Sequence, residues 1–554
     1  FMPNQFSFFF RGFQPRYVWK DNKVGGKREY IGEGDEDVEI WMQLFLDLLY
    51  VCMVSKLTHE LIYCTPTPAL FICTFSILYI FYLSRFIIDE FCMRFAQDDI
   101  FHRLFYFVYT LGTLIMVLNS DMFRSIGDHG SSPEIFSEYC YVDINYFSGF
   151  SYGFYITRGS ILALYTVTMK FDESGRTYYQ FFHRMLFLIV DIALLLLCDL
   201  TTNTVNVKMG CIIAIAAFEI IGTVLGVIVV KLKRDGLIQT QYFQYHFPVN
   251  HLVVQARMGQ FVMLVFGESI ISLLSTADHI SGDIYITAIF GLLLIYMLAM
   301  HYYDQVQKYE GEAHAFQRDM LAGLLWVLLH PVVAFFLMLI SAGLVAAVLD
   351  SERARLRAET TSLLALGSGL AVFGMSVQRI THKGLHYRLS SWNKICHLLV
   401  HLSLAGAHLS MLASRLPPRL NVLIHALLAT GSVCFDIACN LSKSSGAVLS
   451  HRGRCPAHNF ISTVGDSIRG TIKAAAGSSK KIHDHTHRND KDNSEMVSKM
   501  EKNGQNHTTG DEEDHQVEEE EEEQEGEGEE GGEIQETHEV YLHVGDDGEF
   551  YCLL

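Results

Sequence analysis

Long apolar segments recur along the chain from about residue 40 to residue 438, separated by shorter polar stretches. A helix needs about 20 mostly apolar residues to cross the hydrocarbon core of a bilayer, where it satisfies its backbone hydrogen bonds internally. The pattern therefore predicts an all-α fold, a polytopic transmembrane helical bundle of 10 to 12 spans. The twelve segments are 41–57, 68–87, 101–119, 148–169, 183–200, 210–230, 259–276, 284–303, 320–348, 361–378, 395–413 and 420–438.

Three of these segments carry a weaker pattern than the rest. Segment 41–57 is short, and small or polar residues dilute 361–378 and 395–413. Small residues let two helix backbones approach closely inside a membrane, so we expect them at helix contacts. They are Gly367, Ser368, Gly369, Ala405, Gly406 and Ala407.

Beyond residue 440 the apolar pattern ends. Residues 478–532 are rich in Lys, Asp and His and then in Glu and Gly, with few apolar side chains to offset the entropy lost on ordering. Residues 501–554 hold 21 of the 61 acidic residues and one basic residue, Lys502. The net charge of −19 thus belongs to a predicted disordered, acidic C-terminal tail. The rest of the chain is nearly neutral, which gives no sign of nucleic-acid binding.

The distribution of Lys and Arg predicts the orientation. If the N-terminus is cytoplasmic, the inner segments carry 21 Lys and Arg and the outer segments carry eight. Cytoplasmic loops are enriched in these residues, so we expect both termini inside, against the local cluster of Arg353, Arg355 and Arg357. The predicted domains are a cytoplasmic N-terminal segment 1–40, a transmembrane domain 41–438 and a cytoplasmic tail 439–554.

The sequence carries no signature of a soluble enzyme or of a metal module. The 12 cysteines stand singly, without a C-x-x-C pair, although Cys64 and Cys140 fall in predicted outer loops where a bridge is feasible. There is no phosphate loop, nucleophile elbow or H-E-x-x-H motif. We therefore expect that the protein is not an enzyme and that it binds no cofactor. The tail run His483, His485 and His487 suits loose metal binding, but a solvated polar tract explains it more simply.

Three segments of the chain carry distinctive motifs. They are WMQLFLDLLYV at 41–51, followed by Leu57 and His59, then RFAQDDIFHR at 94–103, and RMGQF at 257–261 leading into FGESII at 266–271. In this order they resemble motifs of the low temperature requirement protein A family of membrane proteins. The family's usual Glu is replaced at Gln43 and at Ala256. Weaker similarities at Arg158, Tyr302 to Asp304 and His330-Pro331 keep the same order, so the resemblance covers about 40–345. It implies a polytopic membrane protein and leaves the activity open.

Ionisable side chains inside the predicted spans are the first candidates for function, because burying a charge at membrane depth costs at least a few kcal/mol. Gln43 and Asp47 are four residues apart and share a helical face. Arg257, Glu268 and Ser272 share one side of the seventh span, as does Ser275. Such carboxylates suit proton or cation handling. The alternative is that Asp47 and Glu268 connect helices through hydrogen bonds.

Histidines form stripes on the last two spans. His397, His401 and His408 follow one face of the eleventh span, and His425 and Asp436 share a face of the twelfth. Facing stripes could relay protons or hold a transition metal. Hydrogen-bonded histidines that only pack the helices are the simpler alternative.

A polar motif precedes the third span. It consists of Asp98, Asp99, His102 and Arg103 at the predicted cytoplasmic entrance. A functional site is one interpretation. Helix capping combined with an Asp–Arg pair is the other, since acidic groups stabilise a helix N-terminus.

Two functional hypotheses follow from these candidates. The first is a transporter or channel for a small solute or cation, with or without proton coupling, with Asp47 and Glu268 at its core. The second is a non-transporting scaffold or sensor in the lipid bilayer, whose acidic tail recruits a basic protein partner. Convergence of Asp47, Glu268 and the histidine stripe on one site favours the first hypothesis, and dispersal favours the second.

Overall fold

The computed structural model describes most of the predicted membrane domain. The described residues are 14–15, 17–21, 28–32, 40–96, 100–120, 122–125, 140–142, 144–171, 176–201, 204–232, 251–275, 281–306, 315, 320–351, 356–381 and 391–449. By its contacts the chain divides into one unit with Phe1–Ala438 and Val544–Leu554 and a second with Cys439–His543. The predicted disordered tail, including His483, His485 and His487, lies outside the described residues beyond 449, so its character stays a prediction.

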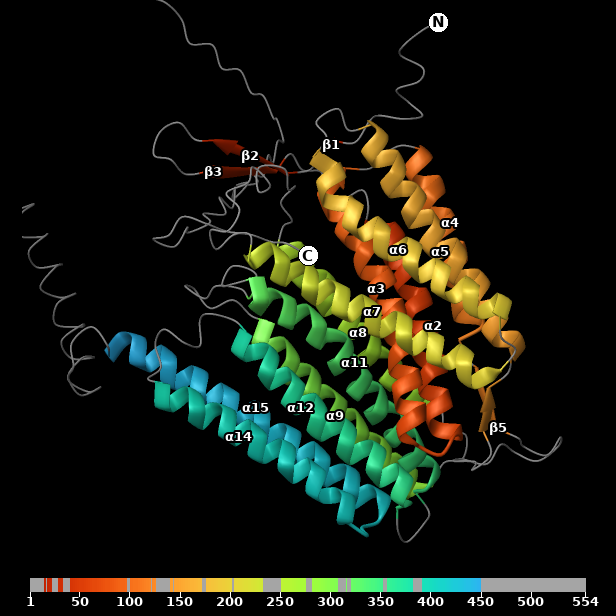
Figure 1. The fold of residues 1–554 in the computed structure, drawn as a ribbon. Coiled ribbons are helices and arrows are strands. Elements are labelled where there is room, and N and C mark those ends of the chain that lie inside the picture. The colour runs from red at the N-terminus through yellow and green to blue at the C-terminus, as the bar shows by residue number, and fades with distance from the viewer. Residues whose placement is uncertain are drawn as a thin grey trace, which may run out of the picture. The chain divides into compact units, whose positions relative to one another are not determined.

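Within the described part of the chain, twelve long helices coincide one to one with the twelve predicted segments (Figure 1). This confirms the all-α, polytopic fold class. The segment 395–413 ends in a short 3-10 turn, η3 (Met411–Ala413). The helices are α2 (Ile40–Tyr63), α3 (Pro68–Arg94), α4 (Ile100–Leu118), α5 (Ile144–Phe171), α6 (Arg176–Thr201), α7 (Val205–Leu232), α8 (His251–Ser275), α9 (Gly282–Val306), α11 (Met320–Leu349), α12 (Ala358–Thr381), α14 (Ser391–Ser410) and α15 (Pro418–Leu449).

Nine of the described helices are both long enough and apolar enough to cross a membrane. The exceptions are α2, α5 and α14, whose lengths of 24, 28 and 20 residues suffice although polar residues dilute them. The protein is therefore a multi-pass membrane protein. The predicted weak span 361–378 meets both criteria as part of α12.

Burial separates central from lipid-facing helices. The apolar windows of α3 and α11 are 83% buried, whereas those of α6, α7 and α9 are 33% buried. Many of the exposed side chains on these outer helices are large and apolar, as at Leu197, Leu200 and Leu225. A helix that is apolar on its exposed face is suited to lipid and not to water. We conclude that α6, α7 and α9 contact the bilayer.

Two glycines allow close contacts between helices, as we predicted from the small residues of the sequence. A Cβ atom at Gly367 of α12 would lie 2.9 Å from the backbone nitrogen of Ile340 in α11. A Cβ atom at Gly369 would lie 3.0 Å from the carbonyl oxygen of Ala405 in α14. A larger residue at either position would push these helices apart. Gly406 faces open space, so the prediction of close packing is wrong there.

The described strands are short antiparallel pairs outside the helices. β1 (Gln14–Pro15) pairs with β4 (Phe95–Ala96), β2 (Tyr17–Asp21) with β3 (Arg28–Gly32), and β5 (Phe123–Ser125) with β6 (Cys140–Val142). The last pair stands between α4 and α5. Cys64, directly after α2, is disulfide-bonded, which agrees with the predicted involvement of this cysteine in a bridge.

Candidate functional site

Four charged side chains meet where α2, α3 and α8 pack together. Asp47 of α2 lies 2.8 Å from Arg85 Nη2 of α3 and 3.3 Å from Arg257 Nη1 of α8. Arg257 Nη2 also donates to Asp89 Oδ1 of α3 at 3.0 Å, and Arg257 Nε donates to Asp89 Oδ2 at 3.3 Å. All four residues are buried. We call Asp47, Arg85, Asp89 and Arg257 the charge quartet.

The charge quartet is electrically balanced, with two carboxylates against two guanidinium groups. Further contacts surround the arginines. Arg257 Nη1 donates to Gln260 Oε1 at 2.6 Å, and the Arg85 guanidinium lies 5.7 Å from the ring of Tyr50 and 5.4 Å from that of Phe261. Mutual pairing and aromatic faces offset the cost of burying each charge. This arrangement is suited to holding three helices together.

Sequence reasoning found half of the charge quartet. Asp47 and Arg257 are candidates from the sequence, whereas Arg85 and Asp89 are not. Arg85 falls near the end of the predicted segment 68–87, and α3 continues beyond it to Arg94, with Arg85 1% exposed inside the helix. The i, i+4 spacing of Arg85 and Asp89 next to an apolar run was the signal that could have revealed them. Gln43, one turn before Asp47, is half-buried.

Glu268 of α8 lies at the interface with α2, the helix that carries Asp47, but its surroundings differ from those of Asp47. It is 1% exposed and is located three turns along α8 from Arg257. Ser272 donates a short hydrogen bond to its Oε1 atom, and Ser55 of α2 also hydrogen-bonds to the carboxyl group. Within the described residues these hydroxyls are its partners, and no cationic side chain pairs with it. Ser272 is half-buried and Ser275 is exposed.

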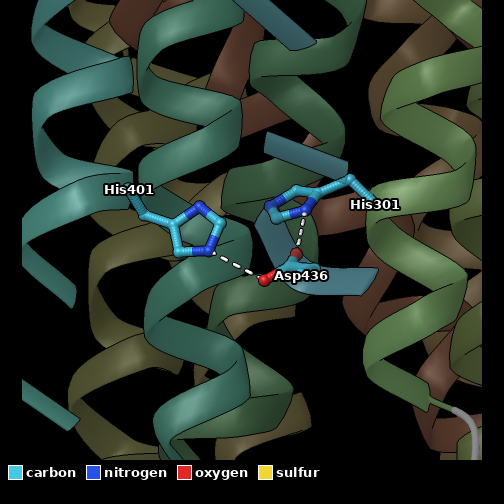
Figure 2. Close-up of side chains that lie close together, drawn as sticks. All are labelled: His301, His401 and Asp436. Carbon is cyan, nitrogen blue, oxygen red and sulfur yellow. Dashed lines mark hydrogen bonds and ion pairs between the residues drawn. The ribbon is translucent and has the colours of Figure 1, made fainter. Parts of the chain in front are cut away.

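A second polar cluster joins α9, α14 and α15 (Figure 2). His301 Nδ1 of α9 lies 2.9 Å from Asp436 Oδ2 of α15, and His401 Nε2 of α14 lies 3.0 Å from Asp436 Oδ1. Arg379 Nη1 of α12 reaches the same Oδ1 atom at 2.5 Å. His301, His401 and Asp436 are each at most 1% exposed. We call these three residues, two histidines and one aspartate, the histidine trio.

The predicted histidine stripes of α14 and α15 do face each other. Besides the contact of His401 with Asp436, His408 Nδ1 lies 2.8 Å from His425 Nδ1, and the two rings stack with their centroids 5.1 Å apart. His397 belongs to α14, but its side chain lies outside the described part of the structure. His301 was missed because it stands alone near the end of α9, and no pattern within one helix links it to the stripes.

The weaker family similarities also fall at buried contacts. Tyr302 Oη of α9 and His330 Nε2 of α11 are 3.0 Å apart, and Gln378 Nε2 of α12 lies 3.2 Å from His330 Nδ1. Arg158 of α5 pairs with Glu219 of α7 at 3.4 Å. The residues of the resemblance therefore include several that connect different helices.

The loop motif before α4 is described only in part. Asp98 and Asp99 lie outside the described residues, so their predicted capping role stays a prediction. His102 is buried with its ring 6.4 Å from that of Phe91, and Arg103 is exposed. These two residues therefore have different environments although they are adjacent in sequence.

The sequence candidates occupy separate places in the bundle. Glu268 is eleven residues beyond Arg257, which corresponds to about 16 Å along an α-helix. The histidine trio belongs to α9, α14 and α15, whereas the charge quartet belongs to α2, α3 and α8. In the contacts of the described residues, Asp47, Glu268 and the histidine stripe do not converge on one cluster.

Comparison with known proteins agrees with the sequence motifs. The family model described as bacterial low temperature requirement A protein (LtrA) matches residues 40–431. This range extends past the predicted limit near residue 345 and includes His401 and His425. No curated protein and no solved structure shows a significant match. Because the match covers well over half of the sequence, the chain belongs to the low temperature requirement A family.

Proposed function

We propose that this protein is a transporter or channel that moves a small solute or cation across the membrane in exchange for, or together with, protons. The observation that carries the proposal is the environment of Glu268. This carboxyl group is buried in a membrane-spanning helix and is held by the hydroxyls of Ser272 and Ser55. Glu268 is the proton-carrying group in this mechanism.

Two properties of this environment suit reversible protonation. A hydroxyl can donate a hydrogen bond to a carboxylate or accept one from a carboxylic acid, so Ser272 and Ser55 satisfy both states. The described structure places no fixed positive charge against Glu268 that would hold it in the ionised form. Loss of its proton therefore creates a net local charge, which a transported cation can balance.

The charge quartet has a different role in this proposal. Asp47 was expected in the pathway on sequence grounds, but it meets Arg85 and Arg257 in a neutral cluster. We assign the charge quartet to anchoring α2, α3 and α8. Glu268 then works at the other end of an interface that the charge quartet fixes.

The remaining expectations fit the same proposal. We infer that the protein is neither an enzyme nor a cofactor carrier, and that both of its termini are cytoplasmic. The disulfide at Cys64 supports this orientation, because disulfides persist on the non-cytoplasmic side and Cys64 follows a helix that would run outward.

One observation favours a second candidate function. The dispersal of the charge quartet, Glu268 and the histidine trio is typical of polar groups that connect helices. In this alternative the protein is a membrane scaffold or sensor, and the acidic tail recruits a basic protein partner. The alternative gives Glu268 no role in flux.

Flux measurements on the full-length protein in liposomes separate the two functions. A pH-sensitive dye inside the vesicles reports proton movement when gradients of K⁺, Na⁺ or H⁺ are imposed. We expect flux with the wild type, loss of flux with Glu268→Gln, and retention with Glu359→Gln, a matched change in the first turn of α12. The glutamine keeps hydrogen bonds to Ser272 and Ser55 but cannot carry a proton. Full flux in Glu268→Gln would contradict the assignment, and absence of flux in the wild type would support the scaffold.

A further inference from the structure

The histidine trio has the donor set of a metal site. Two imidazoles and one carboxylate come from three different helices, and one ligand atom from each lies within 4.8 Å of the others. A tetrahedral zinc ion, with bonds of about 2.0 to 2.2 Å, holds its ligand atoms about 3.3 Å apart. Small side-chain movements therefore bring the three atoms onto one ion. Figure 2 shows both rings turned toward the carboxylate of Asp436.

The neighbours of the histidine trio orient these ligands. Ser432 Oγ lies 3.0 Å from His401 Nδ1 and can accept a hydrogen bond from the Nδ1–H group. In that tautomer the Nε2 lone pair is available to a metal ion beside Asp436. Arg379 holds Asp436 Oδ1, while Oδ2 lies beside His301. Metal-binding histidines and carboxylates usually have such outer hydrogen bonds, which fix the ring and its tautomer.

We propose that His301, His401 and Asp436 form a binding site for a first-row transition-metal dication such as Zn²⁺. Neutral imidazoles and one carboxylate suit Zn²⁺ and its neighbours, whereas Ca²⁺ and Mg²⁺ prefer all-oxygen sites. Three protein ligands leave a further coordination position open. The site is separate from Glu268 and does not depend on transport, so its test is independent of the flux measurements.

Arg379 distinguishes this site from a purely structural cluster. Its positive charge on Asp436 opposes a dication, so Arg379→Gln is expected to tighten metal binding at least several-fold. If the cluster only connects helices, the same change removes an ion pair and adds no metal affinity.

The test uses the full-length protein in detergent, stripped of metal with a chelator and titrated with Co²⁺. Co²⁺ bound by two imidazoles and a carboxylate absorbs visible light, and Zn²⁺ should displace it. We expect the wild type to bind one equivalent of Co²⁺ with this absorption. We expect His301→Ala and His401→Ala to lose this Co²⁺ binding. His408→Ala, which changes another histidine of α14, should retain the Co²⁺ binding. A triple alanine variant at 483, 485 and 487 should also retain it, which would exclude the tail histidines as the source of the Co²⁺ signal.

A second measurement guards against variants that fail to fold. Zn²⁺ should raise the Tm of the wild type and of His408→Ala, and it should not raise that of folded His401→Gln. X-ray absorption of the zinc-loaded wild type should show nitrogen and oxygen ligands that include imidazole. The proposal is wrong if the folded wild type binds no Co²⁺, if the signal survives in His401→Ala, or if only the tail variant loses it.

Discussion

The interface between α2 and α8 carries two buried polar regions that differ in one respect. At one end, the charge quartet surrounds each carboxylate with arginines. Three turns along α8, Glu268 is equally buried, but its described partners are the hydroxyls of Ser272 and Ser55. The same two helices thus bury one compensated group of charges and one carboxyl group without a counter-charge.

This difference shows that burial alone does not identify a functional charge. A paired charge is costly to disturb, because removing one partner leaves the other buried and uncompensated. A lone carboxyl group avoids the cost of ionisation by keeping its proton, so it remains free to exchange that proton. The charge quartet should therefore control stability, and Glu268 should control activity.

The largest stability effect is expected from Asp47→Asn. The amide cannot balance Arg85 and Arg257, so the free energy of unfolding should fall by about 3–5 kcal/mol. Denaturant or thermal unfolding in detergent measures this change. The matched control is Asp283→Asn, because Asp283 forms an ion pair with Arg419 in which both side chains are exposed. That pair should contribute less than about 1 kcal/mol. Equal losses of stability in Asp47→Asn and Asp283→Asn would show that the buried charge quartet stabilises the protein no more than an exposed ion pair does.

Combining Asp47→Asn with Arg257→Gln tests whether the charge quartet acts as one unit. The double variant is neutral again, with one arginine and one aspartate left in α3. Its loss of stability should be smaller than the sum of the single losses, by roughly 0.5–3 kcal/mol. The same unfolding measurements on both single variants and the double variant give this coupling. Additive losses would show that the four charges act independently.

Glu268 should show the reverse pattern, with a modest effect on stability and a large effect on flux. Glu268→Ala leaves the hydroxyls of Ser272 and Ser55 without this partner, at an expected cost of about 1–3 kcal/mol. Glu268→Gln should cost less, because it keeps the hydrogen bonds. Both variants should lose proton-coupled flux. If stability falls as far as in Asp47→Asn, Glu268 is a structural contact like the charge quartet.

The smallest effect is expected from deletion of residues 478–554. The composition of this segment predicts that it buries almost no apolar surface, so insertion and the Tm in detergent should be unchanged. Fractionation of membranes and thermal unfolding measure the two properties. A truncated protein that fails to insert, or melts at a lower temperature, would show that the tail contributes to the membrane domain.

The sequence determined the elements of this protein and several of its candidate residues. Hydrophobic segments located all twelve described helices, because the membrane requires long apolar runs and a helix satisfies its own backbone. Family motifs pointed to Asp47, Arg257 and Glu268, and the helical period pointed to His401 and Asp436. These signals are local, since each is contained within one helix or one motif.

Only the tertiary structure decided which of these residues meet. Arg85 and Asp89 compensate Asp47 and Arg257, Ser55 approaches Glu268, and His301 completes the histidine trio. The partners in each group come from different helices, and His301 and Asp436 are 135 positions apart in the chain. No period within one helix encodes such a pairing. It is set by how helices pack and rotate against each other, and that packing decides whether a buried charge is compensated.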